Sequence, residues 1–66
     1  MNLKLRRARL ERLWTIALAA EKVGVSLQTY SRWERGVQQP HLTSLRTLCE
    51  VFGKSPEELG FGDRLH

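Results

Sequence analysis

The chain has 66 residues, 41% of them apolar, and a formal charge of +4 at neutral pH. A chain of this length supplies one hydrophobic core, so we take residues 1–66 as a single domain, without room for a large sheet or a deep substrate cleft. The positive charge favours a polyanionic partner such as nucleic acid, because net charge governs long-range attraction. Residues 1–12 alone carry a net charge of +4.

The sequence indicates no disulfide, metal site, membrane span or set of catalytic residues. Cys49 is the single cysteine, and no group of Cys and His residues has the spacing of a zinc site. The longest apolar run, residues 16–20, is far short of the ~20 residues that span a bilayer. His41 and His66 have no neighbours that suggest acid–base work. We therefore expect a soluble, cytoplasmic, non-enzymatic protein with no metal, cofactor or membrane partner.

Capping residues define the first three predicted helices. These helices are expected over about residues 3–13, 16–23 and 27–35. Thr15 and Ser26 are suitable N-caps for the second and third helices, because their hydroxyl oxygens accept from free backbone N–H groups. Gly24 and Gly36 are expected to end the same two helices, because glycine readily adopts the left-handed conformation.

The second half of the chain predicts a loop and two more helices. Residues 37–40 are expected to form the loop. A helix over about residues 42–52 places an apolar stripe at spacings of three and four, namely Leu42, Leu45, Leu48, Cys49 and Phe52. Ser55, Pro56 and Glu58 have the capping-box pattern of a short fifth helix that stops at Gly60. The expected fold is therefore all-α, a compact bundle of five short helices.

Residues 16–35 have the features of a helix-turn-helix unit, in which a short turn containing Gly joins two helices. Ala20 lies where the two helices are expected to cross, so a larger side chain there would push them apart. Five residues fall at positions that pack the unit against its neighbours: Ala19, Val23, Val25, Tyr30 and Trp33. The same spacing favours the core over base stacking for the aromatic side chains. In such a unit the second helix enters the major groove of DNA.

Several motifs together identify a family resemblance. They are Gly24-Val25-Ser26, the run SRWERG at residues 31–36, Pro40, the apolar stripe of the fourth helix, and the run SPEELGF at residues 55–61. Over residues 5–61 the sequence resembles the phage repressor/Cro-like helix-turn-helix proteins, often called the Xre family. The resemblance implies a lambda repressor-like fold and a transcriptional repressor that reads double-stranded operator DNA with its third helix.

Base contacts are implied by the resemblance for five residues, which are Ser26, Leu27, Gln28, Ser31 and Arg32. Gln can pair with adenine, and Arg with guanine, through two hydrogen bonds each. Outside this motif, a solvated helix face would be the preferred interpretation of Gln28 and Arg32. We therefore assign them to base reading on the strength of the motif.

Phosphate contacts are implied by the same resemblance at Thr15 and in the loop at Gln38 and Gln39. The chain departs from the family pattern at Ile16, where many members carry a phosphate-binding Gln. It departs again at Gln38 and Gln39, where Lys or Arg is common. We expect three basic residues to supply the missing phosphate contacts: Arg6, Arg7 and Arg35.

Two further features are implied by the resemblance. Arg9 and Glu34 occupy the positions of a partly buried structural ion pair, and the alternative is that they are independent surface charges. We also expect a homodimer, which forms only on DNA if its interface is weak. One candidate interface lies near the fifth helix and comprises Leu59, Phe61 and Leu65. A second candidate comprises Leu10, Leu13 and Leu18.

Other functions of this fold remain open at the level of sequence. An antitoxin or a restriction–modification controller uses the same kind of domain at this length. A protein-interaction module that has lost DNA binding is a different alternative, and the uncharged residues at Ile16, Gln38 and Gln39 favour it. The chain could also be the DNA-binding piece of a longer regulator with a further domain or a partner protein.

Overall fold

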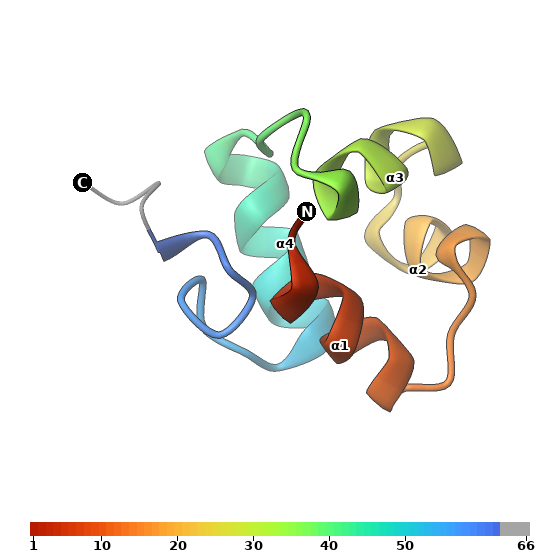
Figure 1. Ribbon diagram of the computed structural model, residues 1–66, viewed down its shortest axis with the longest axis horizontal. Coiled ribbons are helices and arrows are strands. Elements are labelled where there is room, and N and C mark those ends of the chain that lie inside the picture. Colours follow the sequence, from red (N-terminus) through yellow and green to blue (C-terminus); the bar gives the residue numbers. More distant parts are fainter. Residues whose placement is uncertain (63–66) are drawn as a thin grey trace.

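The computed structural model describes residues 1–62 and contains only helices and connecting turns in that range. The helices are α1 (Leu3–Glu11), α2 (Ile16–Val23), α3 (Leu27–Arg35) and α4 (Leu42–Phe52). Figure 1 shows α2 and α3 at one end of the molecule, and α4 with the turn after it at the other. The predicted all-α class is confirmed. None of these four helices is long and apolar enough to cross a membrane.

The helix ends are set by local capping. Asn2, Thr15 and Ser26 each accept a hydrogen bond from a backbone N–H in the first turn of α1, α2 and α3, respectively. Gly24 and Gly36 adopt left-handed φ angles of 87° and 77° and so end α2 and α3. Because each cap depends on residues close together in sequence, the bounds of α2 and α3 agree with the predicted ones.

Helix α1 ends at Glu11, two residues before the predicted end. Leu13 has a φ of 61°, which a right-handed helix cannot accommodate, and its side chain is 91% exposed. A left-handed conformation costs a residue with a Cβ roughly 1–2 kcal/mol. The turn between α1 and α2 therefore carries a strained and exposed leucine, which hydrophobic periodicity did not predict.

The predicted fifth helix is wrong, because only a single turn forms at residues 56–60. The capping box is present: the Ser55 N–H donates to Glu58 Oε1 over 2.8 Å, and the Glu58 N–H donates to Ser55 Oγ over 3.2 Å. The hydrogen bond from the Ser55 N–H to the Glu58 carboxylate lowers the pKa of Glu58. Gly60, with a φ of 83°, then reverses the chain before a second turn can form. The bundle has four helices in the described range, one fewer than predicted.

One hydrophobic core lies beneath the four helices. The buried apolar residues are Leu5, Ala8, Ala19, Ala20, Val23, Tyr30, Trp33, Leu45, Leu48, Phe52, Leu59 and Phe61. Val25 and Cys49, which the pattern placed in the core, are only partly buried at its edge. Trp14 packs on Phe52 with ring centroids 5.5 Å apart, so this aromatic side chain serves the core as well.

Two of the three residues of the first candidate dimer interface are buried, contrary to expectation. Leu59 and Phe61 are 0% and 2% exposed, because the turn at residues 56–60 folds them back onto the core. The side-chain N–H of Asn2 donates to Leu59 O over 2.9 Å and ties this turn to the start of α1. Leu65 lies outside the described residues. Of the second candidate set, Leu10 and Leu13 are exposed and Leu18 is half-buried.

Ala20→Leu is expected to lower the free energy of unfolding by about 1–3 kcal/mol, because overpacking forces a closely packed interior apart. Ala20 is 2% exposed in the core beneath α2 and α3. Ala17→Leu adds the same side chain at an exposed position of α2 and should change stability by less than about 0.5 kcal/mol. Urea unfolding followed by circular dichroism compares the two. Equal stabilities of the two variants would contradict close packing of α2 against α3 at Ala20.

Candidate nucleic-acid interface

Helix α3 divides into a buried face and an exposed face. Tyr30, Trp33 and Glu34 are buried and fix the helix on the core. Four of the predicted base-reading residues lie on the other face. Leu27, Gln28 and Arg32 are exposed, and Ser31 is half-buried. Residues separated by four positions share a face of a helix. The exposed face therefore has two adjacent stripes, Gln28–Arg32 and Leu27–Ser31–Arg35.

Ser26 is placed differently from the other base-reading candidates, because its hydroxyl group is used as the N-cap of α3. It accepts a hydrogen bond from the Thr29 N–H over 3.1 Å and donates one to Thr29 Oγ1 over 3.0 Å. A base contact by Ser26 would compete with a cap of the kind that stabilises a helix by ~1 kcal/mol. The structure therefore favours Ser26 as a residue that positions α3.

Side chains from α1, α2 and α3 line one hollow at the start of α2. A hollow of about 260 Å³ is lined by Arg6 of α1, Ile16 of α2, and Ser31 and Arg35 of α3, together with Arg9 and Glu34. Thr15 caps the same end of α2 by accepting from the Leu18 N–H over 3.0 Å. Arg6 and Arg35 thus line the same hollow as Ile16, which replaces the phosphate-binding Gln of the pattern.

The N-termini of three helices have a positive charge that no acidic side chain neutralises. None of α2, α3 and α4 has an acidic residue in its first turn. The aligned peptide dipoles of a helix give its N-terminus about half a positive charge, which attracts anions. At α4 the N-cap residue His41 makes no side-chain capping bond. The electrostatics of these ends suit the negatively charged backbone of a nucleic acid.

Arg9 and Glu34 form a buried ion pair that joins α1 to α3. Arg9 Nε donates to Glu34 Oε2 over 2.6 Å, and Nη2 donates to Glu34 Oε1 over 3.2 Å. The two residues are 8% and 5% exposed. The hydrogen bond to Glu34 raises the pKa of Arg9. Burial and then the Glu34 carboxylate raise the pKa of the neighbouring Tyr30.

The same pair also fixes the start of α2. Arg9 Nη1 donates to Trp14 O over 2.9 Å, immediately before the N-cap Thr15. The backbone N–H of Asn2 donates to Glu34 O over 2.7 Å at the other end of the pair. One guanidinium group therefore sets the relative positions of α1, the α1–α2 turn and α3.

Arg7 lies apart from this surface, although it is the next residue after Arg6 in the sequence. Its side chain lines a second hollow with Lys4, Glu11 and Lys54. Consecutive residues of a helix point about 100° apart, so Arg6 and Arg7 face different neighbours. The spacing of Lys4, Arg7 and Glu11 by three and four already indicates a shared face, and sequence reasoning missed this signal. Arg7 is therefore not one of the phosphate contacts that we propose.

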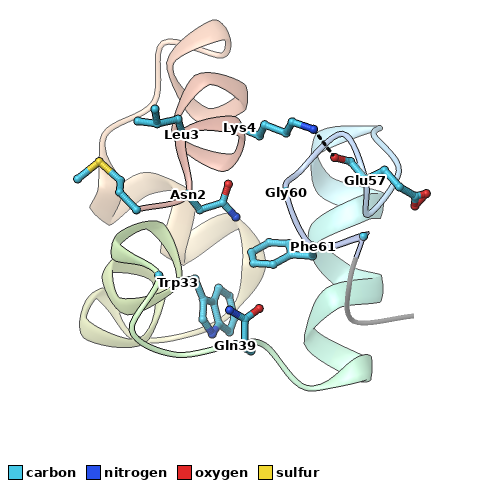
Figure 2. A pocket seen from close by; sticks show the side chains of 11 residues that line it. Asn2, Leu3, Lys4, Trp33, Gln39, Glu57, Gly60 and Phe61 are labelled. Carbon is cyan, nitrogen blue, oxygen red and sulfur yellow. Dashed lines mark hydrogen bonds between the residues drawn. The ribbon is translucent and has the colours of Figure 1, made fainter. Parts of the chain in front are cut away.

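The loop glutamines Gln38 and Gln39 differ in the residues around them. Gln38 is exposed. Gln39 lines a larger hollow of about 610 Å³ with Asn2, Trp33 and Phe61, on the side of the turn at residues 56–60. Figure 2 shows the Gln39 side chain beside the Trp33 ring. Because Gln39 lies at the hollow beside the turn at residues 56–60, we keep Gln38 as the proposed phosphate contact.

Comparison with known proteins identifies the kind of domain. Residues 5–59 match the model of a family described as helix-turn-helix. The HTH-type transcriptional regulator AnsR of Bacillus subtilis is 32% identical over 60 residues, which make up 89% of this chain and 52% of that protein. The chain thus spans about half the length of this curated relative. No solved structure gives a significant match.

Proposed function

The chain belongs to the Cro/C1-type helix-turn-helix family, and from this membership we propose that it is a DNA-binding transcription regulator that represses by occupying an operator. The observation that carries the proposal is the juxtaposition of two surfaces. The side chains of Gln28 and Arg32 on α3 are exposed and make none of the hydrogen bonds found in residues 1–62. Beside it lie Arg6 and Arg35 at the start of α2.

The two surfaces suit the two kinds of contact that DNA recognition requires. Gln28 has an amide that matches the N6 and N7 atoms of adenine, and Arg32 has a guanidinium group that matches O6 and N7 of guanine. Arg6 and Arg35 supply charge to phosphates, together with Thr15, Gln38 and the free N–H groups of α2. Leu27 and Ser31 complete the base-facing surface.

The proposed binding mode is a homodimer on DNA. One chain presents few base contacts, whereas specific protein–DNA interfaces bury about 1,000–2,500 Å² of protein surface. Two chains related by a two-fold axis would read half-sites about 34–36 Å apart, one turn of the duplex. The exposed Leu10 and Leu13 are the remaining candidate contacts between chains, since Leu59 and Phe61 are buried.

Footprinting on a duplex selected by the protein tests the dimer. We expect protection of two half-sites and two chains per duplex at saturation. Protection of a single half-site with one chain per duplex would contradict it. A Leu13→Ser variant should weaken the second binding event more than the first.

One alternative has an observation in its favour. A protein-interaction module of the same fold would tolerate the uncharged residues Ile16, Gln38 and Gln39, at positions where phosphate anchors are usual. The hollow that Arg6 and Arg35 line together with Ile16 argues for retained DNA binding, because it brings positive charge to the same site. An antitoxin or a restriction–modification controller would share the DNA contacts proposed for Gln28 and Arg32.

Selection of duplexes from a random pool tests the proposed function. We expect enrichment of a motif that contains adenine and guanine at neighbouring positions of each half-site, and preferential binding of the enriched duplex over a scrambled one. The absence of enrichment at low salt would overturn the proposal in favour of the interaction module.

A further inference from the structure

A hollow of about 610 Å³ lies behind α3, on the side of the turn at residues 56–60. Trp33 lines it from the buried face of α3, whereas Gln28 and Arg32 lie on the exposed face of the same helix. The volume is within the range of about 300–1,000 Å³ that is usual for small-molecule sites. None of the proposed DNA contacts lines this hollow.

The indole N–H of Trp33 is a buried donor without an acceptor. Trp33 is 2% exposed, and its Nε1 atom has no hydrogen-bond partner. The indole nitrogen can only donate a hydrogen bond, so its partner has to be an acceptor. Most buried polar groups of folded proteins have a partner, and an exception calls for an explanation. Because Trp33 lines the hollow, a molecule bound there can supply the acceptor.

A positively charged group lies at the opposite end of the hollow. Figure 2 shows Lys4 at one end, Trp33 and Gln39 at the other, and the Phe61 ring between them. Lys4 Nζ donates a long hydrogen bond of 3.4 Å to Glu57 O, and the Glu57 carboxylate points away from Lys4. An ammonium group has three donors and no acceptor. Lys4 therefore keeps donors and a full charge for an anionic group.

The indole N–H can be reached at the Trp33 end. Gln39 lies beside the indole ring, is exposed, and has a side chain that makes none of the hydrogen bonds found in residues 1–62. Exposed side chains change rotamer within nanoseconds, so Gln39 can move aside for an acceptor. A carboxylate is the strongest acceptor that a small molecule commonly carries, because its hydrogen bonds are charge-assisted.

The middle of the hollow offers no free polar side chain. The Asn2 side chain is fully used, since it accepts from the Leu5 N–H over 3.0 Å and donates to Leu59 O over 2.9 Å. The Phe61 ring and Gly60 supply apolar and flat surface beside it. This part of the hollow suits an apolar body, because few polar groups there would lose water on binding.

We propose that this hollow binds an elongated small molecule with an apolar middle and a carboxylate at each end. One carboxylate accepts from the Trp33 indole N–H, and the other faces the Lys4 ammonium group. The proposal goes beyond the proposed function and does not depend on it, because the site lies on the buried side of α3. A failure to bind DNA would leave it standing.

Nuclear magnetic resonance of the two indole N–H groups tests the site directly. The probe is naphthalene-2,6-dicarboxylate, which is rigid and carries both carboxylates, and Trp14→Phe assigns the two signals. We expect the Trp33 signal to move downfield with a Kd of about 1 mM or tighter. Trp14 packs on Phe52 and does not line the hollow, so its signal should not move.

Two lysine and arginine variants of α1 test the charged end. Lys4→Met should weaken binding of the dicarboxylate by about fivefold, which corresponds to loss of one exposed ion pair. It should leave the affinity for 2-naphthoate, which has one carboxylate, nearly unchanged. Arg7→Met removes a neighbouring charge that does not line this hollow, and it should bind both probes as the wild type does.

Three results would overturn the proposal. The first is a Trp33 signal that does not move at about 10 mM dicarboxylate, ten times the expected Kd. The second is an equal movement of the Trp14 and Trp33 signals, which would indicate non-specific association. The third is an equal effect of Lys4→Met and Arg7→Met, which would remove Lys4 from the site.

Discussion

Arg9→Met is expected to lower the free energy of unfolding by about 3–5 kcal/mol, because it leaves the Glu34 carboxylate buried without a partner. Arg9 makes two hydrogen bonds to Glu34 and one to Trp14 O, and all three would be lost. A domain of this size has a total stability of roughly 3–5 kcal/mol. The single variant should therefore be largely unfolded at room temperature, which circular dichroism and urea titration would show.

A double-mutant cycle separates burial from pairing. Replacing both residues, as Arg9→Met with Glu34→Leu, should restore most of the stability, because a buried pair exchanged for apolar side chains is often neutral. The cycle should give a coupling energy of at least about 2 kcal/mol. The exposed pair of Lys54 and Glu11, 3.7 Å apart, is the control, with an expected coupling of about 0–1 kcal/mol. A coupling energy near zero between Arg9 and Glu34 would show that the two charges behave as solvated surface charges, and it would contradict the buried ion pair.

Local sequence signals predicted most of the fold. Helices α2 and α3 have the expected bounds because Thr15, Ser26, Gly24 and Gly36 act within one turn of the helix ends that they define. The same local logic found the capping box at Ser55 but failed to predict that the capped segment is a single turn. Whether a capped turn grows into a helix depends on tertiary packing, and here Asn2 and the core hold the chain in a reversal at residues 59–61.

Residues far apart in sequence account for the rest of the differences. Phe61 looks like an exposed interface residue in the sequence, because the residues next to it give no sign of burial. In the structure it lies with the start of α1 and Trp33 at one hollow. Arg6 and Arg7 look equivalent in a basic segment of the sequence. On the surface of α1, however, Arg6 lies beside the start of α2, whereas Arg7 lies beside Lys54. The left-handed Leu13 could not be predicted, because glycine or asparagine usually occupies that conformation.

Arg32→Ala is expected to weaken binding to the selected duplex by about 1–3 kcal/mol and to relax preference mainly at one base pair. Arg32 is exposed on α3 and is not part of the hollow that holds Arg6 and Arg35. Arg6→Ala should instead weaken binding to selected and scrambled duplexes alike. Loss of one phosphate contact should also lower the slope of log affinity against log salt by about one unit.

Arg7 offers a matched control for both variants, because it is an exposed arginine of α1 on a different face. Arg7→Ala removes the same charge from the chain as Arg6→Ala. It should leave the salt slope unchanged if Arg7 does not touch a phosphate. A decrease of one unit in Arg7→Ala would return Arg7 to the DNA-facing surface.

The most direct test of the central claim is to titrate the wild-type chain and Arg32→Ala against the selected and scrambled duplexes at several salt concentrations. Recognition of bases by α3 predicts that Arg32→Ala loses most of its preference for the selected duplex while its salt slope stays that of the wild type. An equal loss of affinity for both duplexes, with a salt slope lower by about one unit, would identify Arg32 as a phosphate contact and contradict its role in base reading.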